Sequence, residues 1–229
     1  AHVAIRLAVA ERLAHRRRDW RGTVKDLFQP AEEGGGGALR MSQEGVLEGV
    51  HAALGLHVWM DVDAGSIGVV EGPMMAASRE FRLTVRGRGG HGALPHHTVD
   101  AVMVASQIVV AAQTIISRNT SPLDTAVLTF GSIRAGSGPN VIAEEAVLEG
   151  TFRAFRTEVI ADLQDRLASV GAGIATAMGA TCELTLGERP YPPTVNDPGM
   201  VALVVEAAAD FRPAERIRLD EGIRTMAAE

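Results

Sequence analysis

The stretch "EFRLTVRG", residues 80–87, decides how the middle of this sequence folds. Apolar and polar residues alternate strictly along it. Phe81, Leu83 and Val85 share one face of an extended chain, whereas the arginines and the threonine between them share the other. Such alternation is typical of an antiparallel strand with one buried face and one wet face. We therefore expect a sheet that is covered on one side only.

The elements that follow this strand predict a ferredoxin-like unit. Apolar periodicity and turn residues divide the sequence into helix, strand, strand, helix and strand, expected over residues 98–118, 125–133, 146–155, 160–178 and 182–186. Together with the first strand, the order is βαββαβ, which is that of the split βαβ sandwich. The unit is predicted to span about residues 76–190.

The flanking regions predict a different architecture. Helices are expected over residues 3–18, 38–50 and 200–211, and strands over residues 23–28, 52–59 and 65–70. Strands alternating with helices favour an α/β layer with a mostly parallel sheet. The sequence thus predicts one α/β domain, formed by residues 1–75 and 191–229, that is interrupted by an inserted ferredoxin-like domain over residues 76–190.

The composition limits which binding partners and which cellular compartment suit this chain. The 229 residues are 46% apolar and 22% charged, which suits a globular chain. The net charge of −6 argues against nucleic acid or an anionic membrane as a partner, because both require a basic surface. The single cysteine, Cys182, excludes an internal disulfide and favours the reducing cytoplasm. No apolar run is long enough to span a membrane, and the abrupt ends suggest an internal piece of a longer protein.

Two adjacent carboxylates form the first candidate site. Glu32 and Glu33 lie between Pro30 and four glycines, where a predicted strand gives way to a helix, and His57 lies at the end of the next predicted strand. Ligands bind at the carboxyl ends of strands in α/β sheets. Carboxylate and imidazole are ligands for zinc or manganese, and the second carboxylate could then act as a base.

Other interpretations of these residues stay open. A glutamate pair at a helix start also suits the positive end of the helix dipole, and a lone histidine such as His57 is often a core residue. A phosphate-binding loop is excluded, because no Gly-Lys-Ser/Thr follows the glycines and two acids would repel a phosphate.

Three residues of the inserted region form a second candidate set. His91 lies in a glycine-rich bend, Asn140 lies in a turn, and Arg153 lies on the strand face that also carries Glu149 and Thr151. Together, histidine, asparagine and arginine could hold a carbonyl oxygen and a carboxylate. Taken singly, they also suit a turn histidine, a turn asparagine and an exposed strand arginine.

A series of motifs carries a resemblance to a known family. The motifs occur in one order: "FQPAEEGGGGA", "GLHVW", "GRGGHGALPH", "SPLDTAVLTFG", "GPNVIA", "LEGTFRAF" and "PPTVND". The series resembles the M20 family of metallopeptidases and amidohydrolases, in its aminoacylase-like branch with hippurate hydrolases and auxin-conjugate hydrolases. The resemblance covers essentially the whole sequence. It implies a zinc-peptidase-like α/β domain with a ferredoxin-like lid, which is often used for dimerisation.

The resemblance also implies an activity and residue roles. It implies hydrolysis of N-acyl amino acids at a centre of two divalent metal ions, zinc or manganese, with cobalt or nickel as alternatives. Glu32 resembles the general base, and Glu33 and His57 resemble metal ligands. His91 resembles the lid histidine that polarises the scissile carbonyl, and Asn140 and Arg153 resemble groups near the substrate carboxylate. A homodimer joined through the lid is expected.

The sequence departs from the family pattern at several points. The family's Cys-Gly-His-Asp ligand stretch would precede Ala1, and His2 resembles the histidine that closes it, which is not usually a ligand. The late C-terminal histidine is absent, and alanines at 101 and 143 replace the usual prolines. We therefore expect residues 1–229 alone to be inactive. The alternatives are a di- or aminopeptidase of the same superfamily, or a metal-free binding or dimerisation module.

Overall fold

The computed structural model describes residues 1–32, 36–219 and 221–228, and the chain divides into two compact units. Unit 1 comprises Ala1–Gly68 and Ala202–Leu219, and unit 2 comprises Val69–Val201 and Asp220–Glu229. The main hydrophobic core, which runs from Ala77 to Ala180 in sequence, lies entirely within unit 2.

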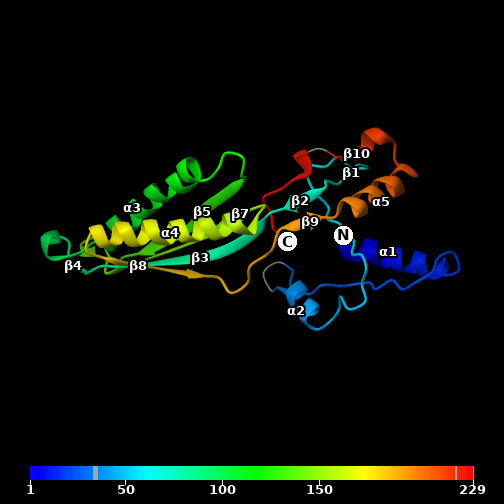
Figure 1. Ribbon diagram of the computed structural model, residues 1–229. Helices are drawn as coiled ribbons and strands as arrows, with labels where there is room; N and C mark the ends of the chain where they lie inside the picture. Colours follow the sequence, from blue (N-terminus) through cyan, green and yellow to red (C-terminus); the bar gives the residue numbers. More distant parts are fainter. Residues whose placement is uncertain (33–35, 220, 229) are drawn as a thin grey trace. The chain divides into compact units, whose positions relative to one another are not determined.

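Unit 2 is built on a four-stranded antiparallel sheet whose strand order is β5-β7-β3-β8. Its strands are β3 (Ala77–Arg86), β5 (Ala126–Ala135), β7 (Glu145–Ala154) and β8 (Thr181–Leu186). Two helices, α3 (Ala101–Thr114) and α4 (Thr157–Ala177), lie along the same face of the sheet (Figure 1). The predicted βαββαβ order is confirmed, and the strand order is that of a ferredoxin-like sandwich.

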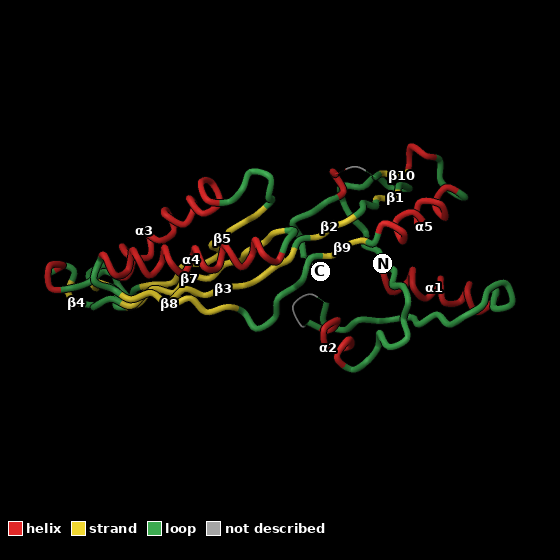
Figure 2. The backbone as a smooth tube through the Cα atoms, viewed as in Figure 1, coloured by secondary structure: helices red, strands yellow, loops and turns green. Residues whose placement is uncertain are grey.

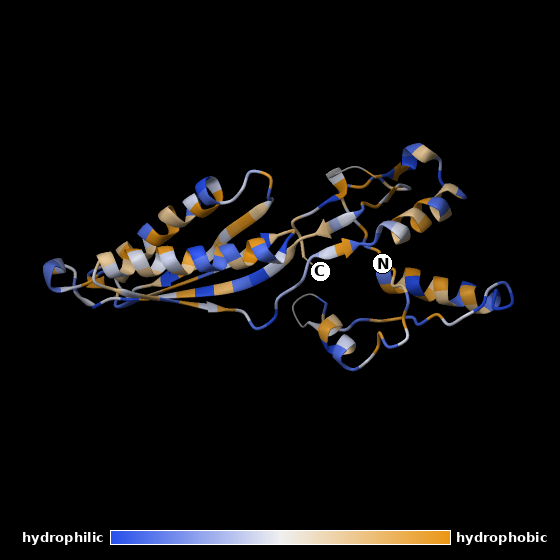
Figure 3. Cartoon of the chain, in the orientation of Figure 1, coloured by the Kyte–Doolittle hydropathy of each residue, from blue (hydrophilic) through white to orange (hydrophobic). Residues whose placement is uncertain are grey.

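The apolar face of the sheet and the apolar sides of the two helices form one core. Phe81, Leu83 and Val85 of β3 are buried with Leu148 and Phe152 of β7, together with the apolar side of both helices. Figure 3 shows that both helices carry apolar and polar residues, as expected of helices that cover a sheet. The alternation seen in residues 80–87 therefore has the predicted meaning.

Helix α3 illustrates how local chemistry sets an element's start. The Asp100 carboxylate accepts hydrogen bonds from the main-chain N–H groups of Val102 and Met103, so the helix begins at Ala101 rather than at residue 98. The helix continues as a π-helical turn, Ile115–Asn119. By length and composition the stretch 101–119 could cross a membrane, but its buried residues belong to the core shared with the sheet.

Two short ladders complete unit 2. Strand β4 (Gly90–His91) pairs with β6 (Val141–Ile142), and β2 (Gly72–Met75) pairs with β9 (Thr194–Asn196), both antiparallel. The chain therefore enters and leaves the sandwich through neighbouring strands. The Asn196 side chain reinforces this pair by donating to the Val70 carbonyl at 2.8 Å.

Unit 1 contains less regular structure than the sequence predicts (Figure 2). Its elements are α1 (His2–His15), α2 (Gly37–Gln43), the turn η3 (Ala214–Arg216) and a two-residue parallel pair of β1 (Ile67–Gly68) with β10 (Ile217–Arg218). The strands predicted over 23–28 and 52–59 are wrong, since both segments are described and neither is a strand. Apolar runs predict burial, but a strand also requires a partner with which to form a ladder.

Helix boundaries in the flanking regions follow backbone geometry. Helix α2 ends at Gln43 rather than at residue 50, because Gly45 takes a φ of 85°, which a right-handed helix cannot include. Helix α5 (Pro198–Ala209) confirms the helix predicted over 200–211, and the turn η4 (Glu221–Ile223) follows later. The chain is thus a mixed α/β protein with one well-built sandwich.

Candidate active site

The loop that carries Glu32 closes tightly on itself. A side chain at Gly37, the first residue of α2, would collide with the Pro30 carbonyl group, and Gly36 takes a left-handed φ of 65°. Ala31 also takes a positive φ, 50°, which is uncommon for a residue with a side chain. Strained backbone of this kind often occurs at functional sites. Glu32 is half-buried in this loop, and Glu33 lies outside the described residues.

Side chains rather than a ladder fix the segment that leads into this loop. Arg6 of α1 forms an ion pair with Asp26 at 3.0 Å, and both side chains are about three-quarters buried. The Lys25 ammonium donates to the carbonyl groups of Val46 and Glu48, at 3.3 and 2.7 Å. Residues 23–28 are therefore anchored on both sides, even though they form no strand.

His57 is oriented by the carbonyl group of the residue that follows it. Its Nδ1 lies 2.7 Å from the Val58 carbonyl oxygen. A carbonyl oxygen only accepts hydrogen bonds, so Nδ1 carries the proton and the lone pair of the neutral ring lies on Nε2. This is the arrangement in which a histidine binds a metal through Nε2. His2 and Trp59 pack edge-on against the ring, with centroids 4.9 and 5.1 Å away.

His91 has the opposite tautomer. The main-chain N–H of Ala93 donates to its Nδ1 at 3.1 Å, so the proton of the neutral ring lies on Nε2. The exposed ring therefore offers an N–H donor, which is what stabilisation of a carbonyl oxygen requires. The residue itself is fixed by the pairing of β4 with β6, in which His91 lies opposite Val141.

The structure brings His91 and Asn140 together. The Gly92 N–H donates to the Asn140 carbonyl at 2.8 Å, and a side chain at Gly92 would press against the main chain of Asn140. An open hollow of about 650 Å³ adjoins this loop, lined by Gly92, Asp100 and the turn that contains Pro139. The two residues therefore belong to one end of unit 2.

Arg153 lies at the other end of the sheet. It pairs with Ser78 at the start of β3, whereas His91 follows the end of that strand. The eight residue steps from Ser78 to Arg86 span about 26 Å at the usual rise of a strand. The Arg153 guanidinium donates to the Met226 carbonyl at 2.9 Å. Within one chain, Arg153 and the pair of His91 and Asn140 therefore lie toward opposite ends of the sheet.

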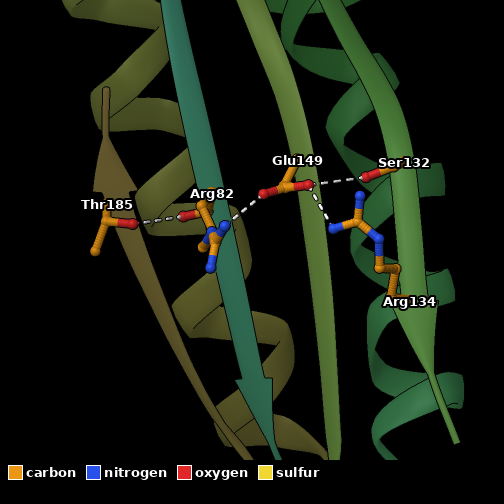
Figure 4. Close-up of polar contacts among 5 residues, drawn as sticks. All are labelled: Arg82, Ser132, Arg134, Glu149 and Thr185. Carbon is orange, nitrogen blue, oxygen red and sulfur yellow. Dashed lines mark hydrogen bonds and ion pairs between the residues drawn. The ribbon is translucent and has the colours of Figure 1, made fainter. Parts of the chain in front are cut away.

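The uncovered face of the sheet carries a network of charges (Figure 4). The Glu149 carboxylate accepts from Arg82 at 2.6 Å, from Arg134 at 2.7 Å and from the Ser132 hydroxyl at 3.2 Å. Arg134, and next to it Arg82, hold the pKa of Glu149 below its usual value. This cluster ties β3, β5 and β7 together, and its charges are already paired.

The described residues include no complete metal site. In the ranges 1–32, 36–219 and 221–228, no group of three histidine, cysteine, aspartate or glutamate side chains is close enough to hold a metal ion. His57 nevertheless fits the role of one ligand, because a carbonyl group holds its Nδ1, which places the lone pair of the neutral ring on Nε2. Cys182 lies in the core of unit 2, where burial raises the pKa of its thiol to about 11.

Sequence reasoning missed the contact between His2 and the segment of His57. The Val58 N–H donates to His2 Nε2 at 3.0 Å, across 56 residues of sequence. The only available signal was that His2 resembles the closing histidine of a ligand motif, which by itself gives no role for the side chain.

Comparison with known proteins gives consistent matches along the whole chain. The family model for peptidase family M20/M25/M40 matches residues 1–229. N-acetyl-L-cysteine deacetylase of Bacillus subtilis is 41% identical over 207 residues, which cover 90% of this chain and 50% of that protein. IAA-amino acid hydrolase ILR1-like 4 of Arabidopsis thaliana is 41% identical over 214 residues, which cover 92% of this chain and 49% of that protein.

A solved structure matches the fold as well. The YXEP protein of Bacillus subtilis, described as a dinuclear metal-binding peptidase of the M20 family, superimposes with a TM-score of 0.80 at 32% identity. The match covers 100% of this chain and 57% of that structure. The chain thus spans about half the length of the curated relatives that it matches.

Proposed function

Because the chain belongs to peptidase family M20/M25/M40, we propose that the whole protein is a metal-dependent amidohydrolase that cleaves the amide bond of N-acyl amino acids. The names of the two relatives support this substrate class, since one deacetylates an N-acetyl amino acid and the other hydrolyses an amino acid conjugate. The observation that carries the proposal is the orientation of His57, whose Nδ1 is held by a carbonyl group in the unit that also contains the strained Glu32 loop.

Two divalent metal ions, zinc or manganese with cobalt or nickel as alternatives, would supply the positive charge that makes water acidic and polarises the amide carbonyl. The dinuclear relative supports the number of ions. His57, through Nε2, and Glu33 would be ligands from this chain. Because they are fewer than a catalytic metal needs, the remaining ligands would come from the rest of the protein.

The chain's own residues would divide the remaining work. Glu32 would accept a proton from the attacking water and then deliver it to the departing amine, so that water and amide give a carboxylic acid and an amine. His91 would donate its Nε2–H to the carbonyl oxygen, where negative charge develops. Asn140 and Arg153 would bind the substrate carboxylate. The ferredoxin-like unit, residues 76–190, would serve as a lid inserted into the catalytic domain.

We propose that the lid also joins two copies of the protein. An N-acyl amino acid is about as long as two extended residues, roughly 7–10 Å. Arg153 lies opposite Ser78, which is about 26 Å along β3 from Arg86, and His91 with its neighbour Asn140 lies beyond Arg86. The sheet between them is longer than such a substrate, so one chain does not bring all three residues to it. A second copy, supplying His91 and Asn140 to the substrate that Arg153 binds, would resolve this separation.

Unit 2 has the surfaces that such a dimer needs. Strand β5 is an edge strand, and exposed edges readily pair with other chains. Helix α3 exposes Val102, Met103 and Val110, of which Val110 is 67% exposed. These residues support a homodimer joined through the lid, and the single thiol, Cys182, supports a cytoplasmic location.

The test of the activity uses the full-length protein. We expect turnover of N-acetyl or N-benzoyl amino acids in preference to a dipeptide with a free amine, and loss of turnover when metal is removed. Glu32→Gln should keep fold and metal content but lower turnover by about a hundredfold or more, the usual scale for loss of a general base.

The control for this variant is Glu11→Gln, which makes the same change on the exposed side of α1 and should leave turnover unaltered. Near-normal turnover in Glu32→Gln would remove the assigned base. If the protein cleaves only the dipeptide, the proposed activity changes from amidohydrolase to peptidase.

A further inference from the structure

The main-chain N–H and the carbonyl group of Val58 each bond a different histidine. Its N–H donates to Nε2 of His2 at 3.0 Å, and the carbonyl group of the same residue accepts from Nδ1 of His57 at 2.7 Å. The two rings lie 4.9 Å apart at an interplanar angle of 63°. All three residues belong to unit 1. His2 is thus connected to His57 through one residue of main chain.

The hydrogen bonds assign both tautomers. His2 accepts at Nε2, so the proton of its neutral ring lies on Nδ1, away from Val58. In this arrangement neither nitrogen of His2 has a lone pair for a metal. His57 donates at Nδ1, so its lone pair lies on Nε2. One ring is therefore used to hold the main chain, and the other presents a ligand atom.

The main chain around Val58 needs such an anchor. Residues 51–56 form no hydrogen bond between main-chain groups with any residue that the structure describes, and the predicted strand over 52–59 is absent. Val58 itself is 57% exposed. Helix α1, by contrast, is regular, and His2 is its first residue. His2 therefore attaches an irregular segment to a rigid element.

We propose that His2 is a positioning residue for the metal ligand His57. By holding the Val58 N–H, it restrains the main chain at Val58, the residue whose carbonyl group orients the His57 ring. Groups that orient a metal-binding histidine in this way typically change metal affinity 10- to 100-fold when they are removed. The proposal rests on the proposed function, because it requires His57 to bind metal.

The experiment measures metal affinity in the full-length protein, by competition with a chelator and by the visible absorption of the cobalt(II)-substituted form. His2→Ala should weaken cobalt affinity about 10- to 100-fold and alter the absorption band. His2→Gln should restore affinity to within about threefold, because its amide oxygen can accept from the Val58 N–H as Nε2 does. Circular dichroism should show the same fold for each variant, since alanine is favourable in a helix.

Two further variants make the outcome decisive. His15→Ala removes a histidine from the other end of α1, where the ring bonds the Glu11 carbonyl of its own helix, and should leave cobalt affinity unchanged. His57→Ala should lose metal. If His57→Ala binds metal normally, the proposed function is wrong at this residue. If His57→Ala loses metal but His2→Ala does not, or if His2→Gln is as weak as His2→Ala, the positioning role of His2 is overturned.

Discussion

Glu149 shows how a single carboxylate can stabilise three strands. It lies on β7, between Arg82 of β3 and Arg134 of β5, and it accepts hydrogen bonds from both guanidinium groups (Figure 4). The charged form is the one that these donors favour, which is why the pKa of Glu149 is lowered, first by Arg134 and then by Arg82. Exposed ion pairs individually contribute little, but this carboxylate is shared by two.

The lowered pKa of Glu149 predicts a pH dependence of stability. A carboxylate with a lowered pKa in the folded state stabilises the fold above its unfolded pKa of about 4.3, and this contribution is lost as the pH falls toward the folded value. Glu149→Gln should therefore lower the thermal midpoint at pH 7, and the difference from the unmodified protein should shrink at pH 3. Glu188→Gln, an exposed change in the same unit, serves as the control. A difference that stays constant with pH would contradict this account.

At the scale of elements, Gly150 explains how the aromatic core of the sandwich fits together. A side chain at this position would collide with the Thr129 carbonyl group and come within 2.5 Å of the Phe81 ring. The space is filled by Phe81, which packs against Phe130 and Phe152 with centroids 5.4 and 4.7 Å away. The absence of a side chain in the middle of β7 thus makes room for the largest core residues.

Two glycine-to-alanine substitutions in unit 2 should therefore have opposite signs. Gly150→Ala should destabilise the protein by roughly 1–3 kcal/mol, the usual cost of overpacking. Gly173→Ala lies in the second half of α4, where a side chain would meet nothing within 4 Å, and should stabilise by about 0.5–1 kcal/mol. Thermal denaturation followed by circular dichroism measures both. Equal shifts of the thermal midpoint in the two variants would show that packing around Phe81 does not limit the residue at position 150.

The sandwich and the flanking segments differ in how well the sequence alone predicts their elements. The strands and helices of the sandwich were predictable because each carries its own period, and the sandwich supplies a partner for every strand. The segments 23–28 and 52–59 have suitable apolar residues, but periodicity does not say which distant strand would pair with them. At the site, residue types identified Glu32, His57 and His91 as candidates. The tautomers of both histidines, and the contact of His2 with Val58, depend on neighbours that no local pattern encodes.

At the scale of the whole molecule, the separation of Arg153 from His91 predicts complementation between subunits. His91→Gln and Arg153→Met should each inactivate the full-length protein. When the two variants are mixed and allowed to exchange subunits, half the dimers are mixed, and in each of these one of the two sites has both residues intact. Activity should then recover to about a quarter of the unmodified level, as follows from this two-fold symmetry.

Light scattering at tens of micromolar should show a dimer for each variant, in keeping with an interface of micromolar affinity or better. Val110→Glu, on the exposed face of α3, should weaken the dimer and abolish the recovery without unfolding the sandwich. A monomeric protein with full activity would contradict the dimer. No recovery from a mixture that demonstrably exchanges subunits would contradict the shared use of His91.

The pairing of β2 with β9 has a consequence for how this protein could have diversified. Because Gly72 lies opposite Asn196, the two points at which the backbone crosses into the sandwich are neighbours in space. A segment whose ends are adjacent can be excised, exchanged or grafted with little disturbance to its host. Residues 72–196 therefore have the geometry of a cassette, which recombination could exchange as a single piece.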